Sequence, residues 1–322
     1  MENRKTLVAG AGGFIGHHMV RHLKGRGYWV RGVDIKEPEY EPSQADEFMV
    51  LDLRKEDNCL EATRGIQEVY QLAADMGGIG YITANHADVA VNNVLINAHM
   101  LQAALTNDAT RYFYSSSACI YPMYLQKSPE IGGLKEEDAY PADPEEGYGW
   151  EKLYAEKLCQ YYDEEGKLPT RVARFHNIYG PLGTYDGGRE KAPAAISRKV
   201  AMAADGGEIE VWGDGLQTRS FTYVDDCVEG IYRIMQSEHS APLNLGTDEL
   251  ISVNDLVDLI AKLGGKSLTK RHDTSKPQGV RGRNSDNTQL RSVLGWEPAT
   301  TLEQGLTKTY KWIESQVAGR TG

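Results

Sequence analysis

Residues 6–16 read TLVAGAGGFIG, a short apolar run that passes directly into a glycine-rich turn. Met19, Val20 and Leu23 follow at the spacing of one apolar helix face, so the stretch predicts a strand, a turn and a helix. Glycines in this pattern let the backbone turn tightly and approach a pyrophosphate, whose charge then faces the helix N-terminus. We therefore predict nucleotide binding rather than a plain turn. The expected contacts are Gly10, Gly13, Phe14, Ile15 and Gly16.

An acidic residue ends the second predicted strand, which covers residues 28–33. Asp34 can accept hydrogen bonds from an adenosine ribose diol and would repel a 2′-phosphate, so we predict NAD rather than NADP as the cofactor. A third strand is predicted over residues 48–54. Its Asp52 has two interpretations, a contact with the adenine or a cap on the helix that follows.

The composition of the 322-residue chain is that of an ordinary globular protein, with 40% hydrophobic and 25% charged residues. A formal net charge of −11 argues against a general nucleic-acid binder. No apolar run has the length of a membrane span, and the first residues lack the apolar core of a signal peptide. Four scattered cysteines without a CxxC spacing indicate neither a zinc site nor a disulfide framework. We expect a cytosolic protein without a metal site.

Strand and helix patterns alternate through the first half of the chain, with further strands predicted near 68–74, 112–114 and 170–175. This alternation predicts an α/β fold built on a doubly wound parallel (Rossmann) sheet. The rhythm breaks after residue 177, which predicts a smaller, interleaved C-terminal α/β lobe. We expect an NAD-binding domain over residues 1–177, with returning segments near 218–247. The lobe for the second ligand is expected over 178–217 and 248–322.

Two polar regions are expected to be structural. Residues 123–145 are rich in Pro, Glu and Asp and are predicted to form a surface loop. Asn92, Asn93 and Asn97 lie in a long helix predicted over residues 88–105, where we expect them at exposed or capping positions.

Residues 111–122 read RYFYSSSACIYP, an aromatic strand that runs into three serines and a lone thiol. Small hydroxyls at the carboxyl end of a parallel strand lie where open α/β sheets bind ligands. Ser117 and Cys119 are therefore candidates for a site. The alternative is a Ser-rich loop beside a buried, inert cysteine.

Tyr148 and Lys152 are four residues apart, which places them on one face of a helix. A nearby ammonium favours the phenolate and lowers the pKa of a phenol. A plain surface pair is the alternative, because this spacing is common by chance.

Basic residues gather in the second half of an otherwise acidic chain. They form either a solvated basic face or a site for a phosphorylated substrate. We favour the substrate site, because arginine fits phosphate oxygens and many of these residues fall beside loop glycines. The set comprises Arg189, Lys191, Arg198, Lys199, Arg219, Arg271, Arg281 and Arg283.

Together these motifs resemble the extended short-chain dehydrogenase/reductase family over essentially the whole chain. Members of that family mostly act on nucleotide sugars. The motifs that carry the resemblance are the glycine turn, Asp34, Ser117, Tyr148-x-x-x-Lys152, NIYGP at 177–181, the run from Arg219 to Asp225 and LGW at 294–296.

Longer runs resemble, within that family, the enzymes that invert C3 and C5 of GDP-D-mannose to give GDP-L-galactose, with GDP-L-gulose as a possible side product. These runs are AADMGG at 73–78, SSACIYP at 116–122, RFHNIYGP at 174–181, GREKAPAA at 188–195, WGDGLQTRSF at 212–221 and VRGRNSDN at 280–287. The resemblance implies a GDP-sugar substrate, tightly held NAD and a homodimer.

The resemblance also implies roles for individual residues. Tyr148 would take the proton of the C4 hydroxyl, with Lys152 lowering its pKa and binding the nicotinamide ribose. Ser117 would hydrogen-bond the same oxygen. Cys119 would be the base and Lys191 the acid that invert a carbon from opposite faces. The implied substrate contacts are Gly77, Ser117, Ala118, Cys119, Asn177, Glu190, Lys191, Ala192, Lys199, Gln217, Arg219 and Arg281.

Three other functions stay open at this point. A nucleotide-sugar 4,6-dehydratase would need an Asp-Glu pair after the hydroxyl residue, where this chain has Ala118 and Cys119. A 4-epimerase would leave Cys119 and Lys191 without a role. A regulatory NAD-binding protein would keep the fold without turnover.

Overall fold

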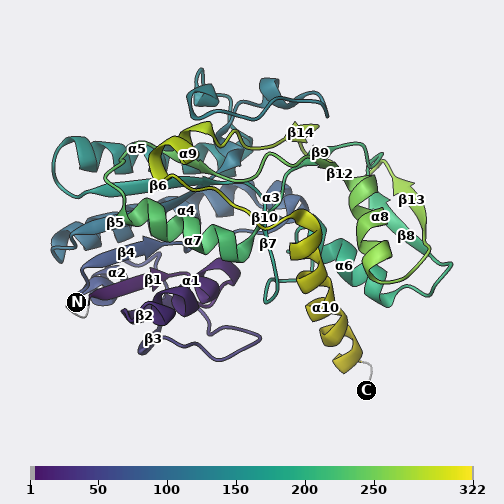
Figure 1. The fold of residues 1–322 in the computed structure, drawn as a ribbon. Helices are drawn as coiled ribbons and strands as arrows, with labels where there is room; N and C mark the ends of the chain where they lie inside the picture. The colour runs from purple at the N-terminus through teal and green to yellow at the C-terminus, as the bar shows by residue number, and fades with distance from the viewer. Residues whose placement is uncertain (1–3, 321–322) are drawn as a thin grey trace.

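A computed structural model describes residues 4–320, and its centre is a seven-stranded sheet in which every neighbouring pair is parallel (Figure 1). The strand order is β11-β6-β5-β4-β1-β2-β3. The strands are β1 (Lys5–Ala9), β2 (Trp29–Asp34), β3 (Glu47–Val50), β4 (Glu68–Gln71), β5 (Arg111–Ser117), β6 (Thr170–Phe175) and β11 (Leu243–Leu245). The predicted doubly wound parallel sheet is confirmed.

Helices cover both faces of this sheet because its strands alternate apolar side chains between two cores. Val8 faces the core that includes Met19 of α1, whereas Leu7 faces the core that includes Met100 of α4. The helices on the first side are α1 (Phe14–Gly25) and α7 (Val224–Gln236). Those on the second are α2 (Glu56–Thr63), α4 (His86–Thr106) and α5 (Glu146–Glu164). No helix between residues 4 and 320 has the length and apolarity needed to cross a bilayer.

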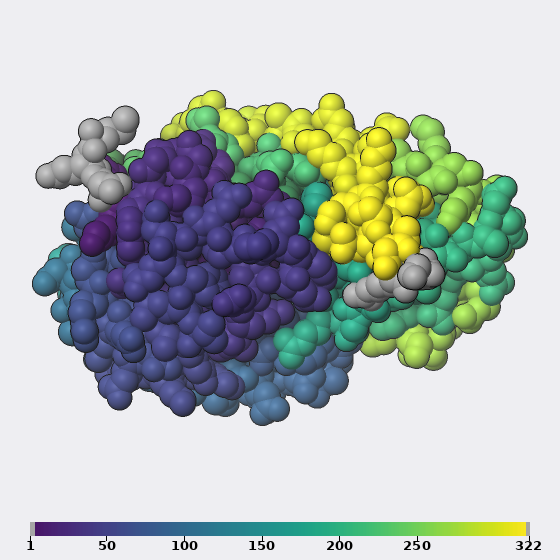
Figure 2. Space-filling view, turned by 90° about the horizontal axis from the view of Figure 1, so that it is seen from below, coloured from purple at the N-terminus to yellow at the C-terminus, as the bar shows by residue number. Residues whose placement is uncertain are grey.

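A smaller group of elements extends from the carboxyl end of the sheet (Figures 1 and 2). In Figure 2 the purple and blue N-terminal half lies on one side of the molecule, the green segments lie on the other, and the yellow α10 lies over their junction. The strands are β7 (Ile178–Tyr179), β8 (Glu208–Trp212), β9 (Thr218–Arg219), β10 (Thr222–Tyr223), β12 (Ile251–Ser252), β13 (Thr269–Asp273) and β14 (Gly282–Arg283). The helices are α3 (Ile79–Ala84), α6 (Ala192–Met202), α8 (Val253–Leu263) and α10 (Leu302–Arg320). Helix α9 (Thr288–Leu294) returns to the main sheet and packs against β11 (Figure 1).

The chain passes between the two parts more than once. β11 pairs with β6 at the edge of the main sheet, and α7 packs beside α1. The lobe is therefore interleaved with the sheet. The domain bounds given above stay a prediction, and their first three and last two residues lie outside the described part of the chain.

Three local expectations were wrong. The third strand ends at Val50, and Asp52 does not cap α2, because Lys55 is the N-cap and the Asp52 carboxylate pairs with Arg54 at 2.9 Å. The contact of Asp52 with the adenine stays a prediction. The segment 123–145 is not only a surface loop, because it contains short 3₁₀ helices at Met123–Gln126 and Glu136–Ala139 and buries Gln126 and Leu134. Asn93 and Asn97 are buried, and their roles are described with the site.

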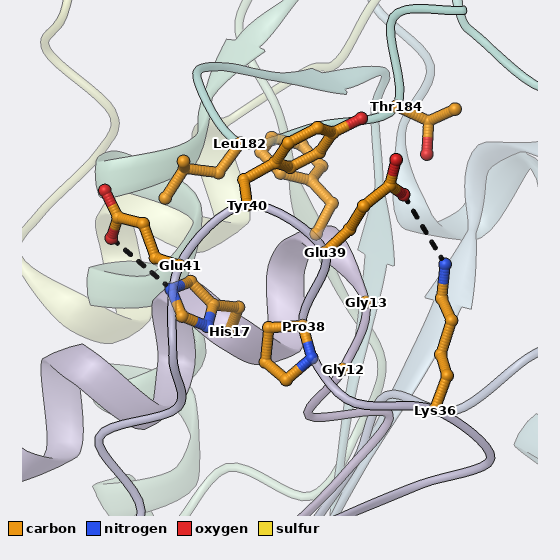
Figure 3. A pocket seen from close by; sticks show the side chains of 11 residues that line it. Gly12, Gly13, His17, Lys36, Pro38, Glu39, Tyr40, Glu41, Leu182 and Thr184 are labelled. Atoms are coloured by element: carbon orange, nitrogen blue, oxygen red, sulfur yellow. Dashed lines mark ion pairs between the residues drawn. The ribbon is translucent and has the colours of Figure 1, made fainter.

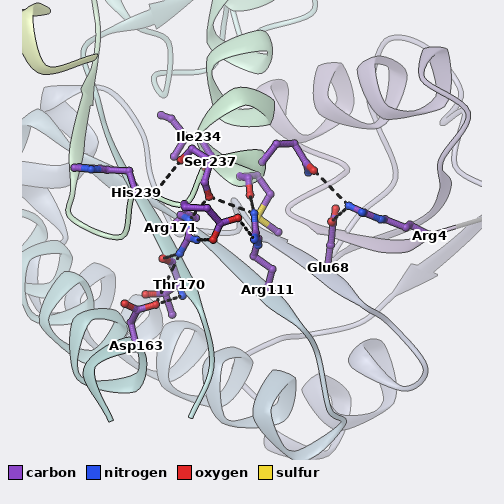
Figure 4. Close-up of polar contacts among 12 residues, drawn as sticks. Arg4, Glu68, Arg111, Asp163, Thr170, Arg171, Ile234, Ser237 and His239 are labelled. Carbon is purple, nitrogen blue, oxygen red and sulfur yellow. Dashed lines mark hydrogen bonds and ion pairs between the residues drawn. The ribbon is translucent and has the colours of Figure 1, made fainter. Parts of the chain in front are cut away.

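Arginines at the amino ends of β5 and β6 hold the end of α7 (Figure 4). Arg111 donates to the carbonyl of Met235 at 2.8 Å, and Arg171 donates to that of Ser237 at 2.8 Å. The last carbonyls of a helix lack partners within the helix, so these guanidinium groups satisfy them and complement the helix dipole.

A buried ion pair joins β6 to α5. Arg174 and Glu156 meet at 2.9 Å, with side chains 4% and 2% exposed. Burial alone would lower the pKa of Arg174, but Glu156 and the Tyr121 hydroxyl outweigh it and raise the pKa, so the guanidinium stays charged. Glu156 also accepts a hydrogen bond from Ser116, and Arg174 donates to the carbonyl of Glu136 at 2.8 Å.

We expect Glu156→Gln to destabilise the fold strongly, because it leaves a buried guanidinium without its counter-charge. Removing one partner of a buried pair costs about 3–5 kcal/mol. Urea unfolding followed by circular dichroism measures the loss. Glu208→Gln is the matched control, since its pair with Arg271 is half-exposed on both sides and should change the free energy of unfolding by less than about 1 kcal/mol. Equal losses in the two variants would contradict this prediction.

Candidate active site

The stretch from Ser117 to Cys119 lies at the carboxyl end of β5, in the middle of the parallel sheet. The strand ends at Ser117, and a 3₁₀ helix, Ala118–Ile120, begins immediately after it. The Ser117 hydroxyl accepts a hydrogen bond from the backbone N–H of Cys119 at 3.2 Å. The serine thus fixes the turn that places the thiol, which is half-buried.

Tyr148 and Lys152 lie on the buried face of α5, and the surface-pair alternative is wrong. They are 4% and 2% exposed, and Lys152 Nζ lies 5.6 Å from the centroid of the Tyr148 ring. Lys152 also donates to the carbonyl of Ser115 at 3.0 Å. This bond ties the ammonium to the strand that carries Ser117.

Burial dominates the ionisation of this pair. It raises the pKa of Tyr148 well above that of a free phenol, and a hydrogen bond from Ser117 only partly opposes the rise. It also lowers the pKa of Lys152, against the attraction of Glu151. The phenol is therefore protonated in the protein without ligands, and a further positive charge is needed to favour the phenolate.

Buried asparagines connect α4 to α5 behind this pair. Asn93 and Asn97 donate to the two carboxylate oxygens of Glu151 at 2.9 and 3.2 Å. Burial raises the pKa of Glu151 to about 7, although Lys152 and both amides lower it. Asn93 also accepts a hydrogen bond from the backbone N–H of Asp75. The amides therefore link the loop after β4 to the helix of the Tyr-Lys pair.

The thiol of Cys119 is in contact with a charged pair. Arg283 Nη1 lies 3.4 Å from Cys119 Sγ, and Arg283 Nη2 lies 2.9 Å from Glu145 Oε2. Burial raises the pKa of the thiol, and Glu145 adds to the rise, while Arg283 and Ser117 oppose it. From the sequence, Glu145 was assigned no role at the site, and Arg283 was counted only among the basic residues expected to bind a phosphorylated substrate.

Lys191 is the N-cap residue of α6 and is half-buried. Burial lowers its pKa, while the negative charges that Cys119 and Cys227 can carry oppose the shift. The ammonium is thus within electrostatic reach of the Cys119 thiol. A lowered pKa makes it a stronger acid than a free lysine.

The loop that carries Lys191 is held against the loop after β4. Arg189 lies over the Tyr81 ring at 3.8 Å and pairs with Asp75 at 3.4 Å. Its carbonyl accepts a hydrogen bond from the N–H of Gly78 at 3.0 Å. A Cβ at Gly78 would lie 2.6 Å from the carbonyl oxygen of Glu190, so only glycine permits this approach. Gly77, a predicted substrate contact, lies in the same loop.

Most of the basic set is engaged with carboxylates rather than gathered into one positive face. Arg281 pairs with Asp214 at 3.0 Å, Lys199 with Glu210 at 3.6 Å, and Arg198 with Glu190 at 3.2 Å. Arg271 pairs with Glu208 and Glu210. Neither a solvated basic face nor a single site for a phosphorylated substrate describes the whole set of basic residues.

Arg219 differs from these, because it forms no ion pair within residues 4–320. It donates only to the backbone carbonyls of Thr218 and Val280. Burial, together with neighbouring Arg283, lowers its pKa to about 10. The nearby Gln217 keeps a buried side-chain oxygen without a partner in the described chain. An incompletely compensated arginine suits a phosphate oxygen, whereas the unsatisfied Gln217 oxygen suits a hydroxyl or N–H donor of the same ligand.

Asn177 lies between the main sheet and this region. It has a φ of 45°, a left-handed conformation that asparagine tolerates better than most residues. Its amide donates to the carbonyl of Ser220 at 2.9 Å, which fixes the exit of β6 against the strand that carries Arg219.

The glycine turn has the geometry that a dinucleotide requires. Gly10 has a φ of 83°, and a Cβ there would lie 2.8 Å from the backbone of Ala73. A Cβ at Gly16 would lie 2.0 Å from the carbonyl oxygen of Gly10. The N-cap of α1 is Gly13, and no side chain caps the helix or places an acid in its first turn. The start of α1, with Phe14 and Ile15, is thus left to bind an anion.

Asp34 lies beside this turn and accepts a hydrogen bond from the N–H of Gly12 at 3.0 Å. Burial raises its pKa, against three backbone N–H groups and Lys36. A small pocket, partly open to solvent, begins at Gly12 and Gly13 and continues past Lys36 and Tyr40 (Figure 3). These residues fit the adenosine half of the expected NAD. The Asp52 carboxylate accepts a hydrogen bond from Arg54.

The chain matches the NAD dependent epimerase/dehydratase family over residues 6–246. It is 48% identical over 318 residues to a GDP-mannose 3,5-epimerase of Arabidopsis thaliana, covering 98% of this chain and 84% of that protein. It is 29% identical to a GDP-L-fucose synthase of Escherichia coli, with 98% of both chains covered. A Thermotoga maritima UDP-glucose 4-epimerase crystallised with UDP-glucose has the same fold, with a TM-score of 0.88 at 24% identity and coverage of 97% and 99%. The chain belongs to the NAD dependent epimerase/dehydratase family.

Proposed function

We propose that this enzyme inverts C3 and C5 of GDP-D-mannose to give GDP-L-galactose, with GDP-L-gulose as the product of incomplete inversion. The observation that carries the proposal is the position of Cys119. The thiol lies two residues after the Ser117 hydroxyl, whose oxygen accepts a hydrogen bond from the Cys119 N–H, and it is within electrostatic reach of Lys191. The 48% identity to GDP-mannose 3,5-epimerases supports the same substrate.

Inversion requires the removal of a proton from a sugar carbon that is not acidic. A ketone at C4 makes both C3 and C5 acidic, since each then lies next to a carbonyl. When bound, NAD supplies the reversible acceptor of hydride that the C4 oxidation needs. Tyr148 Oη takes the proton of the C4 hydroxyl. Ser117 Oγ and Lys152 Nζ orient this oxygen and stabilise the phenolate.

Inversion at C3 or C5 then needs two groups on opposite faces of the sugar. Cys119 Sγ removes the proton from one face, and Lys191 Nζ delivers a proton to the other. The lowered pKa of Lys191 suits an acid at neutral pH. The raised pKa of Cys119 opposes its use as a base, so nearby positive charge has to stabilise the thiolate.

The diphosphate is assigned to the basic side chains of the second lobe, with Arg219 as its main partner because no carboxylate pairs with it within residues 4–320. Arg281 and Lys199 would exchange their carboxylate partners for phosphate oxygens. Gly77 leaves room for the hexose. The remaining proposed contacts are Ala118, Asn177, Glu190, Ala192 and Gln217.

We further infer a homodimer built on α4 and α5. Val91, Val94 and Leu95 form an exposed apolar stripe on α4, at helical spacing. Trp150 and Tyr154 form a second on α5, each more than half exposed. The two helices pack side by side, so the stripes suit a second copy of the chain.

Incubation with GDP-mannose in D₂O tests the reaction directly. We expect deuterium at C3 and C5 and an L-galactose product, because each inversion exchanges a carbon-bound proton with an acid/base group. NMR of the recovered sugar reads both positions. Deuterium at neither carbon sinks the proposal, and a C4 epimer without carbon-bound deuterium would indicate a 4-epimerase.

Cys119→Ser and Lys191→Ala should each reduce inversion by about 10²–10⁴-fold, the usual contribution of a general acid or base. Both variants should keep their NAD, measured by chromatography of the nucleotide released on denaturation. Cys59→Ser is a matched control, because Cys59 is a buried cysteine on α2 that the mechanism does not use. Turnover at the wild-type rate in either site variant removes that residue from the mechanism.

The dimer is tested by Val91→Glu combined with Tyr154→Glu. We expect light scattering to give twice the chain mass of 35.7 kDa for the wild type and one chain mass for the double variant, since charge disfavours burial of the stripes. Met202→Glu, at an exposed residue of α6, is the control and should stay dimeric. A monomeric wild type refutes the inference.

A further inference from the structure

The proposed mechanism leaves the ionisation of Cys119 to be explained. A base that removes a carbon-bound proton must be a thiolate, and burial alone keeps this sulfur protonated. The need for a thiolate rests on the proposed function. The ionisation of Cys119 itself can be examined in the protein without substrate.

Two groups of opposite charge lie beside Cys119 and come from different parts of the chain. Arg283 comes from β14 and is 7% exposed at its side chain, with Nη1 at 3.4 Å from Cys119 Sγ. Glu145 is the N-cap residue of α5. Its backbone N–H donates to the carbonyl of Cys119 at 2.9 Å, and its carboxylate accepts a hydrogen bond at 2.9 Å from the same guanidinium that faces the thiol.

Each nitrogen of the Arg283 guanidinium has a different partner, so its orientation is fixed. Nε donates to Gln126 at 2.6 Å, Nη1 faces Cys119, and Nη2 donates to Glu145 at 2.9 Å. Gln126 is itself held by the carbonyls of Tyr121 and Pro122. A donor held this firmly loses little conformational entropy when the sulfur becomes charged.

Both groups are charged in the folded protein. Burial would lower the pKa of Arg283, but Glu145 and Cys119 outweigh it and raise the pKa. Burial would raise the pKa of Glu145, but Arg283 outweighs it and lowers the pKa. The sulfur is therefore placed between a fixed cation and a fixed anion.

We propose that Arg283 and Glu145 are opposed positioning residues that set how readily Cys119 ionises. The guanidinium donates to the thiolate and stabilises it. The carboxylate repels the thiolate and favours the protonated form. Together they hold Sγ in one orientation, whether it is a thiol or a thiolate. The fraction of thiolate is higher than it would be with Glu145 alone and lower than it would be with Arg283 alone.

Other charges also act on Cys119, but through longer distances. Lys191 approaches from the start of α6, Arg219 from β9, and Lys152 from α5. The Tyr148 phenol is neutral until it gives up its proton. Of the charged side chains within residues 4–320, only Arg283 hydrogen-bonds to the sulfur, and Glu145 is tied to this contact through the guanidinium and through the Cys119 carbonyl.

The experiment measures the pH dependence of Cys119 alkylation by iodoacetamide in the NAD-bound enzyme without sugar nucleotide. Mass spectrometry resolves the peptide that carries Cys119. Arg283→Gln should raise the pKa of the thiol and slow alkylation near neutral pH, because the thiolate is the nucleophile. Glu145→Gln should lower the pKa and accelerate alkylation. A rate change of about tenfold corresponds to one pKa unit.

Arg271→Gln is the matched control, because Arg271 is an exposed arginine of β13 that pairs with Glu208 and Glu210. It should leave the alkylation profile unchanged. The three buried cysteines, Cys59, Cys159 and Cys227, report unfolding, since their labelling would rise if a variant lost its structure.

Shifts of the Cys119 pKa in opposite directions in the two variants support the proposal. Simple loss of packing would instead expose the thiol and accelerate its alkylation in both variants. Unchanged profiles, or shifts of the same sign, overturn it. The outcome is separate from the proposed function, since deuterium exchange into the sugar tests the epimerase with the wild type alone.

Discussion

The buried pair of Arg174 and Glu156 is the constraint on which the site depends. Two charges removed from water are tolerable only when each is matched and hydrogen-bonded, and here Tyr121, Ser116 and the Glu136 carbonyl complete the set. The pair fixes α5 against β5 and β6. Because Ser117 ends β5 and the Tyr-Lys pair lies on α5, its geometry sets the distance between the groups that handle the C4 hydroxyl.

Burial, rather than direct charge pairing, is the first influence on every ionisable group proposed for catalysis. It raises the pKa of Tyr148 and Cys119 and lowers that of Lys152 and Lys191. All four shifts favour neutral side chains. A neutral site avoids the cost of isolated buried charges, but the chemistry needs a phenolate and a thiolate. The charges that favour them must come from the bound cofactor and from fixed arginines.

Sequence patterns predicted the features of this structure that depend only on residues close together in the chain. The glycine turn and the Tyr148–Lys152 spacing follow from backbone geometry within a few residues. Asn93 and Asn97 were misjudged because their partner, Glu151, lies more than fifty residues away in sequence. Burial of a polar side chain depends on a distant partner, and a helical pattern alone contains no sign of it.

The same limit explains why Arg283 was predicted to bind a phosphorylated substrate and was not placed beside Cys119. Gly282 precedes it, and a Cβ there would lie 2.3 Å from the carbonyl oxygen of Ser128, so β14 can press against the segment after β5 only with glycine at that position. This contact brings the guanidinium to Gln126 and to the thiol. The segment expected to be a surface loop is therefore part of the site's wall. The reactivity of Cys119 depends on a strand more than 160 residues further along the chain, and the thiol can be positioned for chemistry only once the second lobe has folded against the first.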